Sequence, residues 1–107
     1  MAISRAFADP GLVCSTILFG EYMAKMASSN NYYSYRLTLP STVPFPLFGG
    51  CEGWRGVCHG EDVVYLFAAQ MTKTKTPQEY QLSKDMIQAW TSFAKTGHPG
   101  LMGNTQW

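Results

Sequence analysis

The sequence is poor in charge and has no cluster of charges of one sign. Of its 107 residues 14% are charged, eight basic and seven acidic, for a formal net charge of +1. Because a basic stripe is lacking, nucleic acid is not predicted as a partner. No apolar run reaches the length of a membrane span. Residues 1–13 also lack the pattern of a secretory signal peptide, so the sequence leaves the localisation undetermined.

Cysteine is scarce, with Cys14, Cys51 and Cys58 as its three occurrences. An odd number leaves at least one thiol free or paired outside the chain. For Cys51 and Cys58 the residues leave two alternatives open, buried thiols or a disulfide in an oxidising compartment. Together with His59 they lack a zinc-ligand spacing and a fourth ligand. The sequence therefore predicts no metal site, and no cofactor.

Apolar residues make up 46% of the chain and aromatic residues 14%, which is typical of a packed segment of one domain. A first helix is predicted over about residues 10–28, with Asp9 as its N-cap and Pro10 at its first position. Its apolar face comprises Leu12, Phe19, Met23 and Met26, with Tyr22 beside them. A second helix is predicted over about 77–96. Thr76 and Glu79 form its capping box, and Gly97 closes it.

Between the helices, residues 32–39 alternate in polarity and are rich in tyrosine, which predicts a strand. Residues 40–60 are rich in proline and glycine and predict a long ordered loop that carries His59. The apolar run at 63–67 fits either a short strand or a helical turn. The expected class is α/β, with two main helices and one or two strands. Since one strand cannot form a sheet, we expect the segment to pack against a part of the fold outside this sequence.

His59 is the residue that most suggests chemistry, and a general base needs a nucleophile and an orienting acid. No serine lies in a G-x-S-x-G motif. Cys51 in "GGCEG" has the spacing of a nucleophile, but the strand before it and the helix after it are lacking. Glu61 and Asp62 are the nearest acids, and two or three residues is a short reach for an orienting partner. In the triad order serine, acid, histidine, both partners would lie upstream.

Several stretches together resemble the carboxylesterase type B family, which includes the cholinesterases and insect juvenile-hormone esterases. "GWRGVCHGEDVVYLF" resembles the stretch that bears the family's histidine. "DPGLVC", "YYSYRLTL" and "LSKDMIQAWTSFAKTGHPG" resemble a helix start, a strand and a late helix of the same family, and Trp107 resembles a later tryptophan. Their order and spacings agree over about residues 9–107. The resemblance therefore identifies residues 1–107 as the C-terminal part of a family domain.

The resemblance implies an α/β-hydrolase fold and hydrolysis of a small-molecule carboxylic ester by serine, acid and histidine. It implies that His59 is the catalytic base, that Asp62 supports the site, and that Trp54 and Gly60 shape its loop. It also implies that Cys14 pairs with a cysteine outside the chain. Complete relatives are mostly secreted or in the secretory pathway.

The nucleophile, the oxyanion-hole glycines and the triad acid belong to a region upstream of this sequence, so the chain alone is expected to be inactive. Two other functions stay open. One is a non-catalytic, cholinesterase-like adhesion or binding protein that has lost its triad. The other is a stand-alone interaction module of 107 residues.

Overall fold

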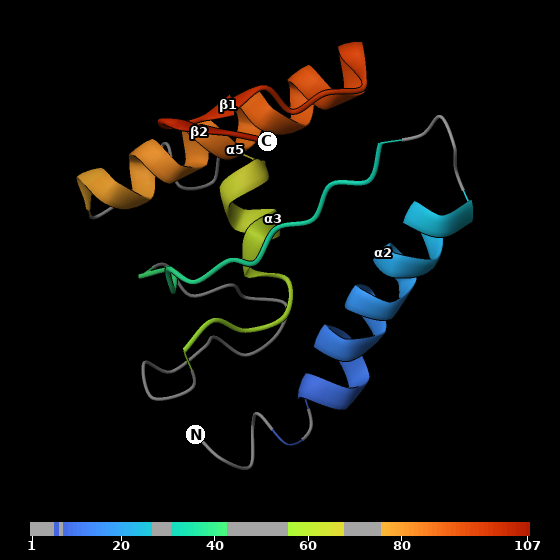
Figure 1. Cartoon of the computed structure of the whole chain (residues 1–107). Coiled ribbons are helices and arrows are strands. Elements are labelled where there is room, and N and C mark those ends of the chain that lie inside the picture. Colours follow the sequence, from blue (N-terminus) through green and yellow to red (C-terminus); the bar gives the residue numbers. More distant parts are fainter. Residues whose placement is uncertain (1–5, 7, 27–30, 43–55, 68–75) are drawn as a thin grey trace. The chain divides into compact units, whose positions relative to one another are not determined.

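A computed structural model describes residues 6, 8–26, 31–42, 56–67 and 76–107 (Figure 1). The chain divides into two compact units, Met1–Tyr35 and Arg36–Trp107. Most of the predicted loop 40–60, including Cys51 and Trp54, lies outside the described residues.

The first unit contains one long helical stretch, formed by η1 (Asp9–Val13) and α2 (Cys14–Met26). In η1 the backbone N–H of Cys14 donates to the carbonyl of Asp9, five residues earlier, which is π-helical pairing. The predicted N-cap was wrong. Ala8 precedes the helix with helical φ and ψ of −72° and −39°, and it provides no side-chain cap. Alanine is the strongest helix former, so the backbone is already helical before Asp9, which lies in the first turn.

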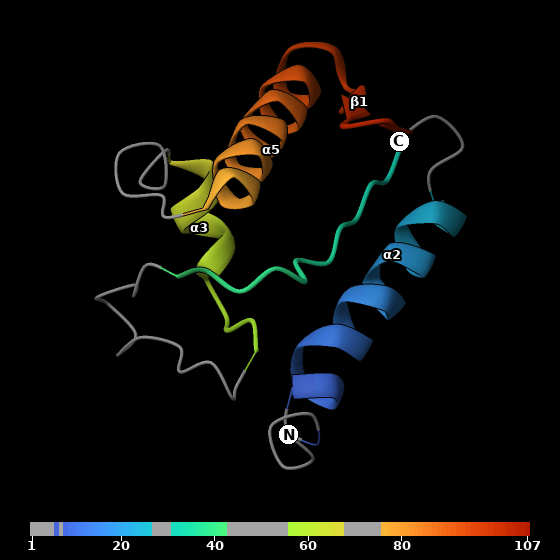
Figure 2. The same cartoon turned by 90° about the vertical axis from the view of Figure 1, so that its left-hand side faces the viewer.

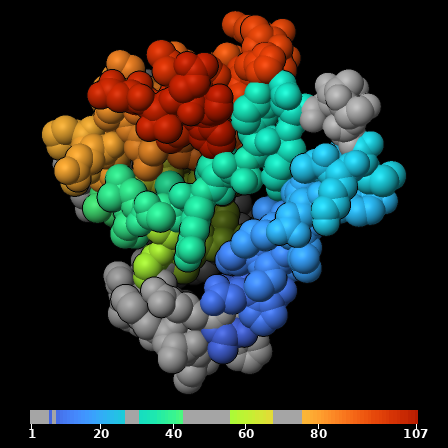
Figure 3. Space-filling model, viewed as in Figure 1, coloured from blue at the N-terminus to red at the C-terminus, as the bar shows by residue number. Residues whose placement is uncertain are grey.

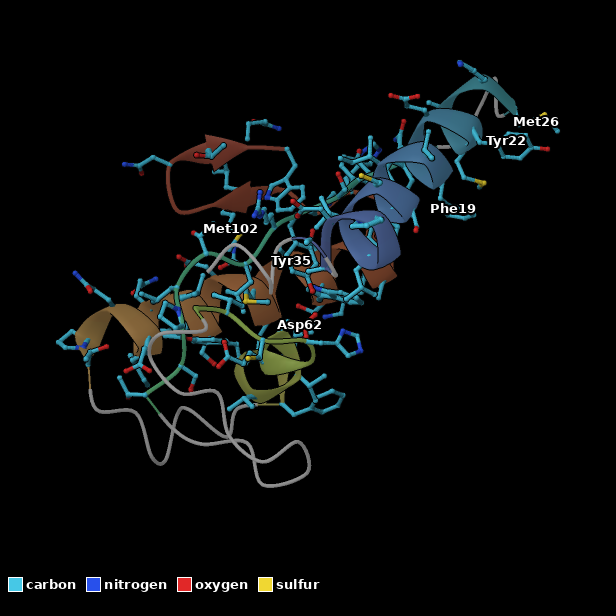
Figure 4. All side chains as sticks on the ribbon, turned by 90° about the horizontal axis from the view of Figure 1, so that it is seen from below. Phe19, Tyr22, Met26, Tyr35, Asp62 and Met102 are labelled. Atoms are coloured by element: carbon cyan, nitrogen blue, oxygen red, sulfur yellow. The ribbon has the colours of Figure 1, made fainter. Side chains whose placement is uncertain are left out.

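The apolar face predicted for this helix is largely exposed. Phe19, Tyr22 and Met26 project from the same side of α2 (Figure 4) and are 58%, 59% and 68% exposed. Tyr32 covers part of the helix: its ring packs edge-on against Phe19 with centroids 6.4 Å apart. Gly20 is buried beneath that ring, and a Cβ at this position would overlap it. The helix therefore requires glycine at this point of close approach.

The predicted strand at 32–39 was wrong. Residues 31–42 follow an extended path (Figure 1), but none of them belongs to a strand. The two strands in the described part of the chain, β1 (Leu101–Met102) and β2 (Thr105–Gln106), pair with each other. An alternating sequence favours an extended backbone, whereas a strand also requires a neighbour to complete its hydrogen bonds.

The second unit is built around α5 (Pro77–Thr96), whose predicted bounds are confirmed. The Thr76 hydroxyl accepts a hydrogen bond from the Glu79 N–H, and Gly97 closes the helix with φ of 76°. Both caps agree with the sequence-based prediction. On this helix Met86 and Ala89 are buried, whereas Trp90 is 49% exposed.

The ambiguous run at 63–67 falls mainly in a helix, α3 (Glu61–Leu66), which packs against α5 (Figure 2). Tyr65 and Val64 are buried at this contact, with 0% and 3% exposure. The buried hydroxyl of Ser83 on α5 donates to the carbonyl of Tyr65 at 2.6 Å. The core of this unit therefore lies between a six-residue helix and a twenty-residue helix.

A short antiparallel hairpin that the sequence analysis did not predict completes the unit. Its strands are β1 (Leu101–Met102) and β2 (Thr105–Gln106). Gly103 has φ of 59° and forms the two-residue turn with Asn104. The hairpin lies on α5, where Figure 3 shows its atoms gathered over the helix. A Gly-Asn dipeptide is one of the recognised turn signals of a tight hairpin, so the signal was present in the sequence.

Candidate active site

His59 lies in a tight turn immediately before α3, and its side chain is exposed. The N–H of Glu61 donates to the carbonyl of Cys58 at 3.3 Å, which closes a four-residue turn. Gly60 occupies the third position with φ of 85° and ψ of 0°. These angles are those of the third residue of a type II turn, a position that favours glycine. The local sequence Cys-His-Gly-Glu therefore presents the histidine at the second position of a defined turn.

A second hydrogen bond crosses the same turn. The N–H of Cys58 donates to Oε2 of Glu61 at 3.3 Å. The backbone N–H of Ser41 also donates to the Glu61 carboxylate, which is 5% exposed. Burial raises the pKa of Glu61 above the ordinary value of 4.5, and the hydrogen bonds from Cys58 and Ser41 oppose that rise. Glu61, the fourth residue of the turn, therefore stabilises the turn through both its backbone N–H and its side-chain carboxylate.

Asp62 is half-buried in the first turn of α3, three residues after His59 (Figure 4). Its Oδ1 accepts the N–H of Val63 at 3.0 Å. A carboxylate in the first turn of a helix interacts favourably with the exposed N–H groups there. The structure thus places His59, Gly60 and Asp62 around one helix start. Trp54, which is expected to shape the loop together with Gly60, lies outside the described residues.

The cysteines differ in their state. Cys58, directly before His59, is disulfide-bonded. Cys14 has a free, exposed thiol, and Cys51 lies outside the described residues.

Within the described ranges no group of three or more His, Cys, Asp or Glu side chains gathers as a metal site. Of the helices in those ranges, none combines the length and the apolarity that a membrane crossing needs.

Tyr65 on α3 interacts electrostatically with Glu61 and with a further carboxylate of the unit, that of Glu79. The Tyr65 hydroxyl donates to the carbonyl of Leu39 at 3.4 Å. Burial raises the pKa of Tyr65 to about 12, and the negative charges of Glu79 and Glu61 contribute to the rise. The phenol, two carboxylates and the extended segment before residue 42 therefore form one connected cluster.

Glu79 connects that cluster to the start of α5. Its carboxylate accepts from the N–H of Thr42 at 2.6 Å, and from the hydroxyls of Thr42 and Thr76 at 2.9 and 2.7 Å. Burial by itself would raise the pKa of Glu79, but these hydrogen bonds outweigh it and lower the pKa. The sequence analysis recognised Glu79 as a capping residue and missed its link to Thr42. No local pattern signals a contact between positions 37 residues apart.

The turn presents the exposed imidazole of His59, and two hydrogen bonds between Cys58 and Glu61 fix the backbone of that turn. An imidazole can take up and release protons near neutral pH, as a general acid–base catalyst must. A nucleophile in a G-x-S-x-G motif is not part of this sequence. The described turn therefore presents an imidazole, but no serine nucleophile of that motif, for acid–base chemistry.

Comparison with known proteins defines the class. The model of the carboxylesterase family matches residues 1–107, and the chain belongs to that family. Mouse cholinesterase is 27% identical over 110 aligned residues, which cover 99% of this chain and 17% of the mouse protein. Human bile salt-activated lipase is 36% identical over 94 residues, covering 84% of this chain and 11% of the lipase. Acetylcholinesterase of Bungarus fasciatus is 28% identical over 100 residues, covering 92% of this chain and 15% of that protein.

No solved structure gives a significant match to this chain. The chain spans less than a fifth of the length of these curated relatives.

Proposed function

We propose that residues 1–107 form the C-terminal part of an α/β-hydrolase domain that hydrolyses carboxylic esters, with His59 as its general base. The family match over the whole chain supports the class of reaction. The observation that carries the role of His59 is its exposed position on a turn fixed from both ends. The relatives named as esterase and lipase support an ester as the substrate class.

In the proposed reaction the imidazole of His59 removes the proton from a serine hydroxyl as the serine attacks the ester carbonyl. It then returns a proton to the departing alcohol. The serine, the triad acid and the oxyanion hole are supplied by a part of the domain outside these residues. Asp62 supports the site from α3, Gly60 permits the turn, and Trp54 shapes the loop before it.

We further propose that Cys51 is the disulfide partner of Cys58, and that Cys14 pairs with a cysteine outside the chain. A covalent link at Cys58 would restrict the loop before His59, in addition to the hydrogen bonds of the turn. The free thiol of Cys14 is exposed and thus accessible for such a pairing.

The exposed apolar face of α2 supports the proposed incompleteness. Exposed large apolar side chains follow one another along this helix, and a monomeric protein rarely leaves such a contiguous surface open. The extended segment at 31–42 likewise has a backbone conformation that could pair with a neighbouring strand. Both features suit packing against the remainder of the same fold.

Activity of the complete reading frame that contains these residues tests the proposal. His59→Ala is expected to lower kcat for hydrolysis of p-nitrophenyl acetate by about 10⁴-fold or more, since the triad acts as a unit. His98→Ala, at the only other histidine of the chain, is the matched control and should change kcat less than twofold, about the scatter of such assays.

Residues 1–107 alone should show no turnover above buffer. Turnover by residues 1–107 alone that requires His59 would contradict the proposed division of the site. An inactive complete protein with a replaced serine would instead support the non-catalytic adhesion or binding protein. A cooperative, monomeric 107-residue chain with no longer reading frame would support the interaction module.

A further inference from the structure

Glu61 is a buried carboxylate between two residues that reach solvent, His59 and Asp62. It is the first residue of α3, next to the exposed His59, and its neighbour Asp62 keeps partial contact with solvent. Removing a carboxylate from water is costly unless hydrogen bonds compensate. The donors given to Glu61 come from the backbone of Cys58 and of Ser41.

These two donors belong to segments that are distant in sequence. Cys58 begins the turn that carries His59, and Ser41 lies at the end of the extended segment 36–42. The next residue, Thr42, is bound by Glu79 at the start of α5. Two buried glutamates therefore hold adjacent residues of one segment, and one of them also holds the histidine turn.

We propose that Glu61 is a positioning residue for the reaction, which fixes the turn of residues 58–61 against the segment 36–42 and thereby sets the direction of the His59 imidazole. This rests on the proposed role of His59 as general base. Glu61 acts through the backbone of Cys58 and takes no proton from the substrate. Asp62, the neighbouring acid implied by family resemblance, accepts the N–H of Val63 at its Oδ1 within α3.

The expected loss of rate follows from how accurately a general base must be placed. A general base must lie within hydrogen-bond reach of the proton that it removes. A displacement of about 1 Å can lower the rate by about 10²-fold. The bond between Glu61 and Cys58 crosses the turn that carries His59, so weakening it should affect catalysis more than substrate binding.

The test compares Glu61→Gln with Glu79→Gln in the product of the complete reading frame. Both substitutions replace a buried carboxylate by a neutral amide, whose single oxygen accepts hydrogen bonds more weakly than a charged carboxylate. Of the two, Glu61 is the one whose carboxylate accepts from Cys58, whereas that of Glu79 accepts from Thr42. We expect Glu61→Gln to lower kcat by about 10-fold to 10²-fold with KM changed less than about twofold. Glu79→Gln should leave kcat per folded molecule within about twofold of wild type.

Hydrogen–deuterium exchange of peptides covering residues 56–61 is measured on the same proteins. Glu61→Gln should accelerate exchange there, whereas Glu79→Gln should accelerate it around residue 42. Equal losses of kcat in both variants, or unchanged exchange at 56–61 in Glu61→Gln, would overturn the proposal.

Failure of the proposed function has a different signature. If the wild-type complete protein is inactive, or if His59→Ala remains active, His59 is not the base and the positioning role for catalysis falls with it. Exchange at residues 56–61 then still decides whether Glu61 fixes the turn. If the wild type is active and depends on His59 while Glu61→Gln retains full kcat, the function stands and the role of Glu61 is refuted.

Discussion

Glu79 and Thr42 are 37 residues apart in sequence, and three hydrogen bonds join them in the structure. The Thr42 N–H lies 2.6 Å from Oε1 of Glu79, and the Thr42 hydroxyl lies 2.9 Å from each carboxylate oxygen. This link ties the extended segment to the first turn of α5. Since Glu79 is 1% exposed, its charge is shielded from water, and the hydrogen bonds from Thr42 compensate for the lost hydration.

Replacement of Glu79 by alanine should strongly destabilise the second unit. It removes a charged acceptor and leaves the N–H of Thr42 without this partner, at a cost of about 3 kcal/mol in the free energy of unfolding. Urea unfolding of wild type and Glu79→Ala measures the cost. Glu21→Ala, on an exposed residue of α2, should change it by less than about 0.5 kcal/mol. Equal effects of the two substitutions would refute the account of this link.

The two buried glutamates should give opposite pH dependences. Because the pKa of Glu79 is lowered from 4.5, its stabilisation is fully present above pH 4.5 and is lost as pH falls through the folded-state pKa. Because the pKa of Glu61 is raised from 4.5, its contribution is present below pH 4.5 and is lost as pH rises through its folded-state pKa.

Urea unfolding from about pH 3 to pH 7 tests this difference. Relative to wild type, Glu79→Gln should be most destabilised near neutrality and approach wild type in acid. Glu61→Gln should gain stability relative to wild type as pH rises above 4.5. Parallel curves for the two variants would show that the two carboxylates do not differ in environment as described.

Tyr65 should resist ionisation until strongly alkaline pH. Its pKa is raised from 10.0 to about 12 by burial and by the charges of Glu79 and Glu61. The sign of the linkage means that its contribution to stability is present below pH 10 and is lost as pH rises through about 12. Absorbance at the tyrosinate band should therefore show a late step that is absent in Tyr65→Phe. Tyr80→Phe, which removes an exposed phenol of α5, should leave that late step in place.

Gly60 should be difficult to replace. An L-residue with φ of 85° is strained by about 1 to 2 kcal/mol, so Gly60→Ala should destabilise the second unit by about that amount. Gly11→Ala provides the contrast, since a Cβ there meets nothing within 4 Å and alanine is the better helix former. Thermal unfolding should show a lower Tm for Gly60→Ala and an unchanged or higher Tm for Gly11→Ala. A tolerated Gly60→Ala would contradict the turn geometry.

The sequence predicted what depends on local interactions. The bounds of α5 followed from a capping box and a closing glycine, which act within a few residues of the helix ends. The prediction of a strand at 32–39 was wrong because a strand needs a neighbouring strand to pair with, and alternating polarity does not reveal whether one is present. Asp9 failed as a cap because the preceding alanines are already helical.

The candidate site shows the same division. His59 was predicted as a site residue because its stretch resembles that of a known family, and Gly60 because it lies in the same stretch. Glu61 was not predicted as an orienting acid because two residues is a short reach to His59, and adjacency in sequence does not reveal which backbone groups a carboxylate binds. Its burial and its link to Ser41 arise from packing between segments, as does the environment of Tyr65.

The measurement that tests the central claim most directly is the 5′ end of the native transcript. If these residues complete a serine esterase with His59 as its base, the reading frame must continue upstream into a G-x-S-x-G motif followed by a further acidic residue. A frame that opens at Met1, or that continues upstream with the serine replaced, would contradict the claim and leave His59 without a nucleophile to activate.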